Sequence, residues 1–177
     1  MQIEVIPEHA LSTATDAAIG TLMDTAFGAG AQYEGRSFHK MRHHVRVVGW
    51  QEGQVIGHVG VQLRAIRAGT TPLTIAAIGE VAVHPNHQGN GMGSALMRQA
   101  IETAKDTVSS FAMLFGHPGL YAPLGFRNQP NRLTYVSWKN HAPCDVVTGT
   151  IESLMVLPLG STQWDETAEI DLCGPLF

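Results

Sequence analysis

Charged residues are scarce in this sequence. Lysine, arginine, aspartate and glutamate together make up 15% of the 177 residues, whereas they are about a quarter of an average soluble protein. Hydrophobic residues reach 44%, so the composition predicts a compact globular chain and excludes a disordered one. The net charge is −4 and no run of basic residues occurs, which excludes nucleic acid as a partner.

Cysteines and long apolar runs are equally scarce. Cys144 and Cys173 are the two cysteines, too few for a disulfide scaffold, and they lack the close spacing of a metal-binding pair. No stretch reaches the ~18 apolar residues of a membrane span, and the amino terminus has no basic region followed by a long apolar one. We therefore expect a single domain over residues 1–177, cytoplasmic and without a membrane partner.

Hydrophobic periodicity divides the chain into strands and helices. Short connections between the strands before Pro85 imply an antiparallel meander, and the helix after that residue implies that the strands on either side of it are parallel neighbours. The result is an α+β domain with one mixed sheet covered by helices. The expected strands are Gln2–Ile6, Val45–Trp50, Val55–Ile66, Leu73–His84, Ser110–Phe115, Arg132–Trp138 and Gly149–Leu157; the expected helices are Thr13–Phe27, Arg36–His43, one from Met92 onward, and a short turn near Leu120 and Tyr121.

The most informative segment runs from Glu80 to Leu96, where a strand leads into a glycine-rich loop that opens directly into an amphipathic helix. Unpaired amide N–H groups and the positive end of the helix dipole converge at such a point, which favours an anion. Gly89, Gly91 and Gly93 allow the backbone to approach a bulky ligand closely. The loop therefore predicts a pyrophosphate site.

Two common phosphate-binding patterns do not fit this loop. The nucleoside-triphosphate loop requires a lysine after its last glycine, and the segment contains none. The dinucleotide pattern Gly-x-Gly-x-x-Gly follows its strand directly, whereas here several residues separate Val83 from Gly89 and Ser94 occupies the place of the third glycine.

Gln88, Gly91 and Gly93 instead match the pattern Gln/Arg-x-x-Gly-x-Gly/Ala, and Tyr121 begins a Tyr-x-x-x-Gly-Phe element that ends at Phe126. With these two motifs in this order, the sequence resembles the GNAT superfamily of N-acetyltransferases. The resemblance implies a mixed and mostly antiparallel sheet, splayed in its middle and flanked by helices, with acetyl-CoA as the co-substrate. The coenzyme-binding residues that it implies are Val81, Ala82, Val83, Gln88, Gly89, Asn90, Gly91, Met92, Gly93 and Ser94.

The resemblance also implies a mechanism. The amine attacks the thioester directly, so no acyl-enzyme forms and neither cysteine is needed as a nucleophile. A backbone N–H near Val83 polarises the carbonyl, and Tyr121 protonates the departing sulfur. Gln88 stands where arginine is frequent in the family, so the phosphates are expected to depend on backbone amides and on the helix dipole.

Glu80 is the candidate base that accepts the proton of the amine. Side chains alternate along a strand, so Glu80 faces away from Val81 and Val83. If the valines pack under the following helix, the carboxylate lies on the side where an amine can enter. Alternatives are a structural glutamate paired with Arg46, Arg64 or a similar partner, and a base role for His84 or His87.

His39 and His43 have the i, i+4 spacing of metal ligands on a helix. Because no third ligand is evident, we expect no metal and interpret the pair as a solvated helix face. Phe27, Tyr33 and Glu34 are candidates for the lining of the acceptor pocket.

The sequence leaves the acceptor open beyond a primary amine of a small molecule or peptide. Two alternatives to acetyl transfer also remain: transfer of a longer acyl chain, and a non-catalytic protein that senses acyl-CoA. A homodimer is the default expectation for the assembly.

Overall fold

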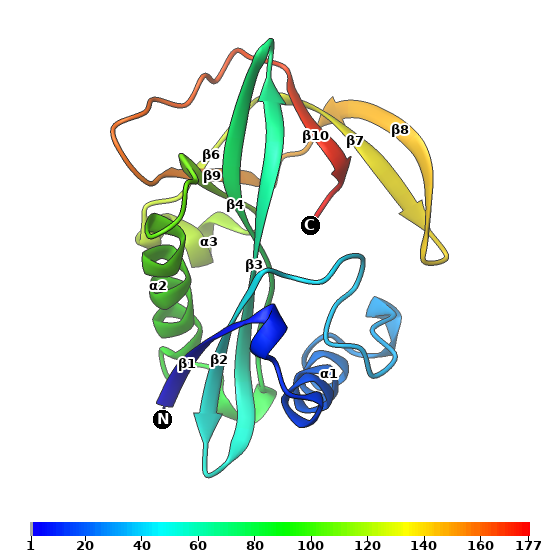
Figure 1. Cartoon of the computed structure of the whole chain (residues 1–177), viewed down its shortest axis with the longest axis vertical. Helices are drawn as coiled ribbons and strands as arrows, with labels where there is room; N and C mark the ends of the chain where they lie inside the picture. Colours follow the sequence, from blue (N-terminus) through cyan, green and yellow to red (C-terminus); the bar gives the residue numbers. More distant parts are fainter. Residues whose placement is uncertain (1) are drawn as a thin grey trace. The chain divides into compact units, whose positions relative to one another are not determined.

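The computed structural model describes residues 2–177. The described residues form two compact units, the first from residues 2–62 and Ile78–Thr103 and the second from Leu63–Ala77 and Ala104–Phe177. Strands β3 (Gln54–Ala68) and β4 (Thr71–Val83) contribute to both units (Figure 1). Among the helices in this part of the chain, none has both the length and the apolar character that a membrane crossing requires.

The first unit is a sheet with a helix on each face (Figure 1). β1 (Gln2–Pro7) pairs antiparallel with β2 (Val45–Gln51), which pairs antiparallel with β3. The turn between β2 and β3 has a positive φ at both Glu52 (50°) and Gly53 (77°), the backbone pattern of a tight hairpin that matches the twist of its strands. The antiparallel pairing expected for these neighbouring strands is confirmed.

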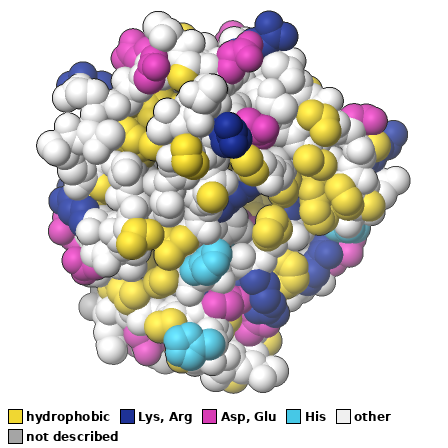
Figure 2. All heavy atoms as spheres, turned by 45° about the horizontal axis from the view of Figure 1, so that its top comes forward, with side chains coloured by type: hydrophobic (Ala, Val, Ile, Leu, Met, Phe, Trp, Pro, Cys, Tyr) yellow, Lys and Arg dark blue, Asp and Glu magenta, His cyan; other side chains and the backbone are white. Residues whose placement is uncertain are grey.

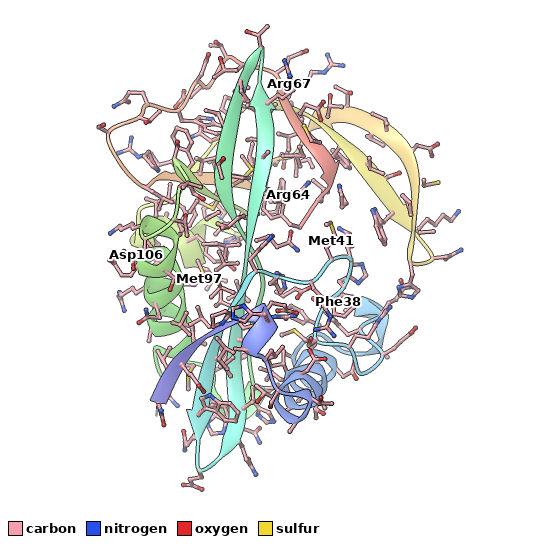
Figure 3. The ribbon with its side chains drawn as sticks, viewed as in Figure 1. Phe38, Met41, Arg64, Arg67, Met97 and Asp106 are labelled. Carbon is pink, nitrogen blue, oxygen red and sulfur yellow. The ribbon has the colours of Figure 1, made fainter. Side chains whose placement is uncertain are left out.

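Helix α2 (Met92–Lys105) packs on one face of this sheet, where the strands carry glycines. A Cβ atom at Gly49 or Gly57 would meet the side chains of Met92 and Leu96, so the missing side chains make room for the helix. Met97 is 2% exposed on the same helix (Figure 3).

Helix α1 (Thr13–Phe27) covers the opposite face and begins where the sequence predicts. The hydroxyl of Ser12 caps it by accepting a hydrogen bond from the amide of Thr15 at 3.1 Å. Ala82 of β4 packs into the core beneath α1, whose buried members are Ile6, Ile19, Leu22, Met23, Tyr33, Val48, Val55 and Ala82. Short 3-10 turns at Glu8–Ala10, Ala29–Ala31 and Pro85–His87 complete the unit.

The second unit combines the other halves of β3 and β4 with the rest of the chain. β5 (Phe111–Phe115) runs parallel to β4, as the helical crossover predicts, and antiparallel to β9 (Leu154–Pro158). β10 (Ile170–Pro175) pairs antiparallel with β3 and parallel with β7 (Arg132–Lys139). The remaining elements are α3 (Pro118–Tyr121), a 3-10 turn at Ala122–Leu124, β6 (Arg127–Asn128) and β8 (Ala142–Thr150), and the buried core comprises Ile66, Ile75, Ala77, Phe111, Met113, Leu133, Leu154, Val156, Ile170 and Leu172.

The pairing confirms a mixed and mostly antiparallel sheet, but two expected elements are wrong. Residues Arg36–His43 form bends and no helix, because their polar groups bind other parts of the first unit. The strand expected over Gly149–Leu157 is two strands, separated at Ile151 by a turn in which Leu154 donates to the Ile151 carbonyl at 3.0 Å. β8 and β10 were not expected.

The segment after α1 approaches the helix at Gly20, where a Cβ atom would overlap the carbonyl oxygen of Gly35. We expect Gly20→Ala to lower the free energy of unfolding by about 1–3 kcal/mol, because the overlap outweighs the better helix propensity of alanine. Urea denaturation measures this, with Gly30→Ala as the control because no atom lies within 4 Å of a Cβ there. Equal stability of the two variants would contradict the prediction.

Candidate active site

The loop between β4 and α2 presents a row of free amide groups. Gly89 and Gly91 have φ values of 79° and 76°, which glycine adopts without strain. The first hydrogen bond of α2 runs from the amide of Ala95 to the carbonyl of Gly91 at 3.0 Å. Within residues 2–177, no group accepts a hydrogen bond from the N–H groups of Gly89 to Ser94. The loop therefore has the unpaired donors that the sequence predicts for an anion.

Two side chains shape this loop from within. The side-chain amide of Gln88 donates to the backbone carbonyl of Val83 at 3.0 Å. The Nδ1 atom of His84 accepts from the backbone N–H of Asn86 at 3.2 Å. The His84 and His87 rings also stack edge to face, 5.6 Å apart. Gln88 thus fixes the loop to the end of β4. Its side-chain amide is therefore already engaged within the loop.

The last part of β4 has an open edge. β5 pairs with β4 only at Ile75, Ala76 and Ala77, and in the rest of the strand only β3 is a neighbour among the described residues. An open edge offers backbone N–H and C=O groups to an extended ligand. The side chain of Ala82 is buried in the core beneath α1, so this residue can contribute only its backbone.

Glu80 is held at this part of β4 by residues of the segment after α1. Its Oε1 accepts a hydrogen bond from the backbone N–H of His39 at 2.6 Å, and its Oε2 contacts Nε2 of His43. Its φ is 53°, which places the residue in the left-handed region. The side chain is 10% exposed. Arg46 and Arg64, which the structural alternative names as partners, bind elsewhere, whereas His43 pairs with this carboxylate.

An ion-pair network anchors the segment that carries His39 and His43. Arg46 is completely buried and donates to Glu8 at 2.7 Å and to the carbonyl of Ser37 at 2.6 Å. Arg42 donates to Glu8 at 2.9 Å and to Asp16 at 3.0 Å, and its guanidinium lies 4.8 Å from the centre of the Phe38 ring (Figure 3). Burial alone would raise the pKa of Glu8, but the two arginines hold that pKa below its ordinary value.

His58 connects this network to β4. Its Nδ1 atom lies 2.9 Å from the carbonyl oxygen of Glu80, and its Nε2 atom lies 3.3 Å from a guanidinium nitrogen of Arg46. A carbonyl only accepts and a guanidinium only donates, so the proton of His58 resides on Nδ1. Burial, with the nearby His43 and Arg46, lowers the pKa of His58 well below its usual value, so the ring stays neutral.

Aromatic side chains adjoin Glu80. The Phe27 and Tyr33 rings stack at 5.4 Å, and the Tyr33 ring meets that of His39 edge to face at 5.8 Å. Burial and then the charge of Glu80 raise the pKa of Tyr33, so its hydroxyl keeps its proton. Phe27 is 44% exposed, which makes its ring the accessible end of this group.

Tyr121 belongs to the second unit. It ends the four-residue helix α3, and its ring lies against Gly116, where a Cβ atom would overlap it. The Tyr121 ring also stacks edge to face on Phe126, 6.2 Å away. Burial raises the pKa of Tyr121, and no described residue hydrogen-bonds to its hydroxyl. The phenol is therefore protonated and able to donate.

The expected solvated helix face at His39 and His43 is wrong, because no helix forms and His43 is 5% exposed. The described residues contain no group of three or more side chains suited to a metal. Cys144 and Cys173 are exposed free thiols.

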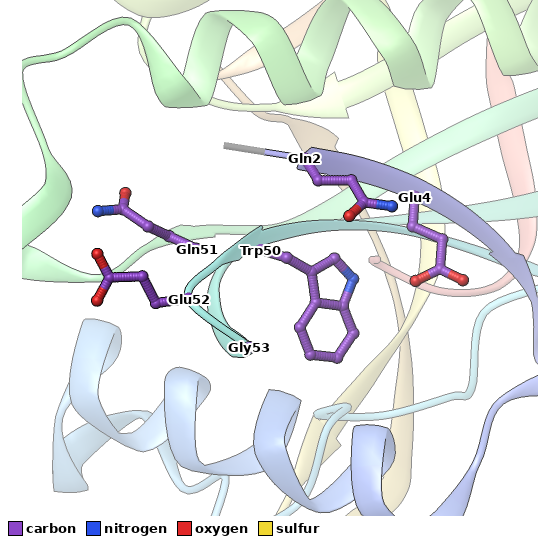
Figure 4. Close-up of a pocket in the computed structure, with 6 residues that line it drawn as sticks. All are labelled: Gln2, Glu4, Trp50, Gln51, Glu52 and Gly53. Atoms are coloured by element: carbon purple, nitrogen blue, oxygen red, sulfur yellow. The ribbon is translucent and has the colours of Figure 1, made fainter.

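A hollow of about 450 Å³ lies beside β1 and the β2–β3 turn, lined by Gln2, Glu4, Trp50, Gln51, Glu52 and Gly53 (Figure 4). None of the predicted site residues lines it, and its two glutamates would repel a pyrophosphate. On the face drawn in Figure 2, acidic and basic side chains are interspersed.

Comparisons with known proteins identify the family and the fold. The model of the acetyltransferase (GNAT) domain family matches residues 11–128. An uncharacterised N-acetyltransferase, ycf52, from Porphyra purpurea is 33% identical over 66 residues, which are 36% of this chain and 38% of that protein's length.

Solved structures share the fold. A GNAT family acetyltransferase from Brucella melitensis in complex with acetyl-CoA has a TM-score of 0.63 at 18% identity, over 96% of this chain and 94% of that one. The Escherichia coli N-acetyltransferase YhbS in complex with CoA has a TM-score of 0.67 at 19% identity, over 97% and 88%. Because the family model covers more than half of the sequence, the chain belongs to the GNAT family of acetyltransferases.

Proposed function

We propose that this protein transfers an acetyl group from acetyl-CoA to a primary amine of a small molecule or peptide, by direct attack and without an acyl-enzyme. The observation that carries the proposal is the row of unpaired N–H groups from Gly89 to Ser94 at the start of α2, next to the open edge of β4. The loop suits a pyrophosphate and the strand edge suits the amide groups of a pantetheine arm.

In the proposed reaction the amine nitrogen forms a bond to the acetyl carbon while the carbon–sulfur bond breaks. Glu80 accepts the proton that the attacking nitrogen releases, and Tyr121 gives its proton to the departing sulfur. A backbone N–H near Val83 stabilises the negative charge on the carbonyl oxygen. Each step keeps the coenzyme as co-substrate and requires no metal.

His84 and His87 are weaker candidates for the base. The Nδ1 atom of His84 is engaged in the loop, and its ring packs against that of His87. Glu80 instead has a carboxylate that lies beside an aromatic group with an exposed edge at Phe27. An ammonium ion is attracted both by a carboxylate and by the face of an aromatic ring, so we propose a cationic amine as the acceptor.

Isothermal titration with acetyl-CoA and with CoA tests the coenzyme site, and absence of binding at millimolar ligand would overturn the proposal. An acceptor screen over polyamines, aminoglycosides, amino acids and peptides, read by release of free thiol, tests the reaction. Tight binding with only slow hydrolysis across the panel would favour the acyl-CoA sensor. Competition between acetyl-CoA and a long-chain acyl-CoA distinguishes the longer-chain transferase.

Tyr121→Phe tests the acid. We expect kcat to fall about 10- to 30-fold, because the phenol proton is lost while water can still protonate part of the departing thiolate. The dissociation constant of acetyl-CoA, measured by titration, should stay within about twofold because the ring remains packed against Gly116 and Phe126. Unchanged turnover would remove the acid role.

The single domain over residues 1–177, the homodimer and the cytoplasmic location stay predictions. Sedimentation of the purified protein tests the homodimer.

A further inference from the structure

His43 is a buried side chain that the proposed reaction does not use. Its side chain is 3% exposed, and its Nε2 atom contacts Oε2 of Glu80. An ionised carboxylate can only accept, so Nε2 carries a proton and donates it to Glu80. The other oxygen of the same carboxylate accepts from the backbone N–H of His39 at 2.6 Å. Two donors, one on each oxygen, therefore determine how the carboxylate lies.

The position of the His43 ring depends on a glycine of β3. A Cβ atom at Gly60 would overlap three atoms of the ring, Nε2 among them. The imidazole thus rests directly on the backbone of β3, which leaves no space for any side chain at residue 60. The ring also lies beside that of His58, with centroids 5.9 Å apart. The strand and the neighbouring ring fix the direction of the Nε2–H bond.

Stability does not account for a histidine at this position. The Nδ1 atom of His43 is buried, and no described residue hydrogen-bonds to it. An unpaired polar atom in the interior costs about 1–3 kcal/mol, which an apolar side chain of similar size would avoid. The histidine is thus explained better by what Nε2 does for Glu80 than by its packing.

We propose that His43 is a positioning residue for Glu80, which orients the carboxylate toward the attacking amine. The inference rests on the proposed base role of Glu80. His58 cannot replace His43, since both of its nitrogens are engaged by the Glu80 carbonyl and by Arg46. The segment from Ser37 to His43 carries both groups that donate to the Glu80 carboxylate. The ion-pair network that anchors this segment through Ser37 therefore also helps to orient the carboxylate.

Two substitutions at residue 43 separate the hydrogen bond from the packing. His43→Leu removes the donor and should lower kcat about 10-fold, because a carboxylate that turns away from the amine transfers the proton less well. The KM for acetyl-CoA should stay within about twofold. His43→Gln keeps an N–H donor at similar reach and should recover most of the lost kcat. A purely structural His43 would instead give both variants the same kcat as the wild type once corrected for the folded fraction, and that result overturns the inference.

Gly60→Ala moves the ring while leaving His43 and Glu80 in the sequence. Its kcat should fall like that of His43→Leu, whereas Gly149→Ala in β8, where no atom lies within 4 Å of a Cβ, should keep wild-type kcat. Wild-type kcat in a folded Gly60→Ala variant would count against the inference.

A double-mutant cycle with Glu80→Gln shows whether His43 acts through Glu80. We expect His43→Leu to have no further effect on kcat in the Glu80→Gln background. If the losses in kcat of the two single variants multiply in the double variant, the positioning role is overturned. Failure of the proposed function would give a different result. Either the wild type would show no turnover, or Glu80→Gln would keep the turnover of the wild type.

Discussion

Gly91→Glu is expected to weaken the binding of acetyl-CoA at least about 100-fold, which corresponds to about 2.7 kcal/mol. The substitution places a carboxylate among the unpaired N–H groups at the start of α2. A bound pyrophosphate would otherwise accept the hydrogen bonds of these N–H groups. Two like charges a few ångströms apart near a protein surface repel by several kcal/mol. The φ of 76° at Gly91 adds strain of about 1–2 kcal/mol for any residue with a Cβ atom. Isothermal titration measures the loss.

Two control variants separate the charge from the backbone strain. Gly91→Ala carries the strain without the charge, so its loss of affinity should be much smaller than that of the glutamate. Gly69→Glu makes the same exchange at a glycine with a positive φ of 56° and no atom within 4 Å of a Cβ, in the turn between β3 and β4. It should bind acetyl-CoA like the wild type. Wild-type affinity in Gly91→Glu would remove this loop from the coenzyme site.

The features of the fold that follow from local pattern were predictable. α1 begins at Thr13 because Ser12 caps it, and β4 and β5 are parallel because a helix connects them. The glycine loop was predictable for the same reason, since its free N–H groups follow from a helix start.

β10 could not be predicted because tertiary contacts define it, whereas β8 is the partner of β7 in a hairpin whose turn residues, Asn140 and His141, both have a positive φ. β10 contains Gly174 and Pro175, which normally interrupt strands, and Cys173 has a φ of 49°. Arg64 compensates by donating to the carbonyls of Leu172 and Pro175 at 2.7 and 2.6 Å (Figure 3). These contacts join residues more than a hundred positions apart in the sequence, so they cannot be predicted from a local pattern.

The surroundings of Glu80 were missed for a related reason. The sequence places Arg46 and His58 within the apolar stretches 45–50 and 55–61, and both residues are completely buried. A charged or polar residue inside a continuous apolar strand is a signal of a buried polar network, because such groups need partners. That signal could have identified the network, but the contributions of Glu8 and His43 depend on the path of the chain before and after α1.

The same surroundings make Glu80→Gln the variant with the largest expected effect on turnover. Glutamine has almost the same shape but cannot accept a proton from the amine, so kcat should fall about 1000-fold, within the range of general base catalysis. The N–H of His39 can still donate to the amide oxygen, so the segment after α1 should keep its position. The dissociation constant of acetyl-CoA should therefore change less than about twofold.

Raising the pH distinguishes a lost base from a lost fold. An amine acceptor that is already deprotonated in solution no longer needs Glu80 to remove the ammonium proton, so the deficit of Glu80→Gln should shrink as the pH rises toward the pKa of the acceptor. A misfolded variant would lose turnover by the same factor at every pH. Glu52→Gln is the matched control, because Glu52 is an exposed glutamate of the same unit, has a similar φ of 50° and has no role in the candidate site. If Glu80→Gln and Glu52→Gln have equal kcat, Glu80 is not the base and the proton leaves the amine by another route.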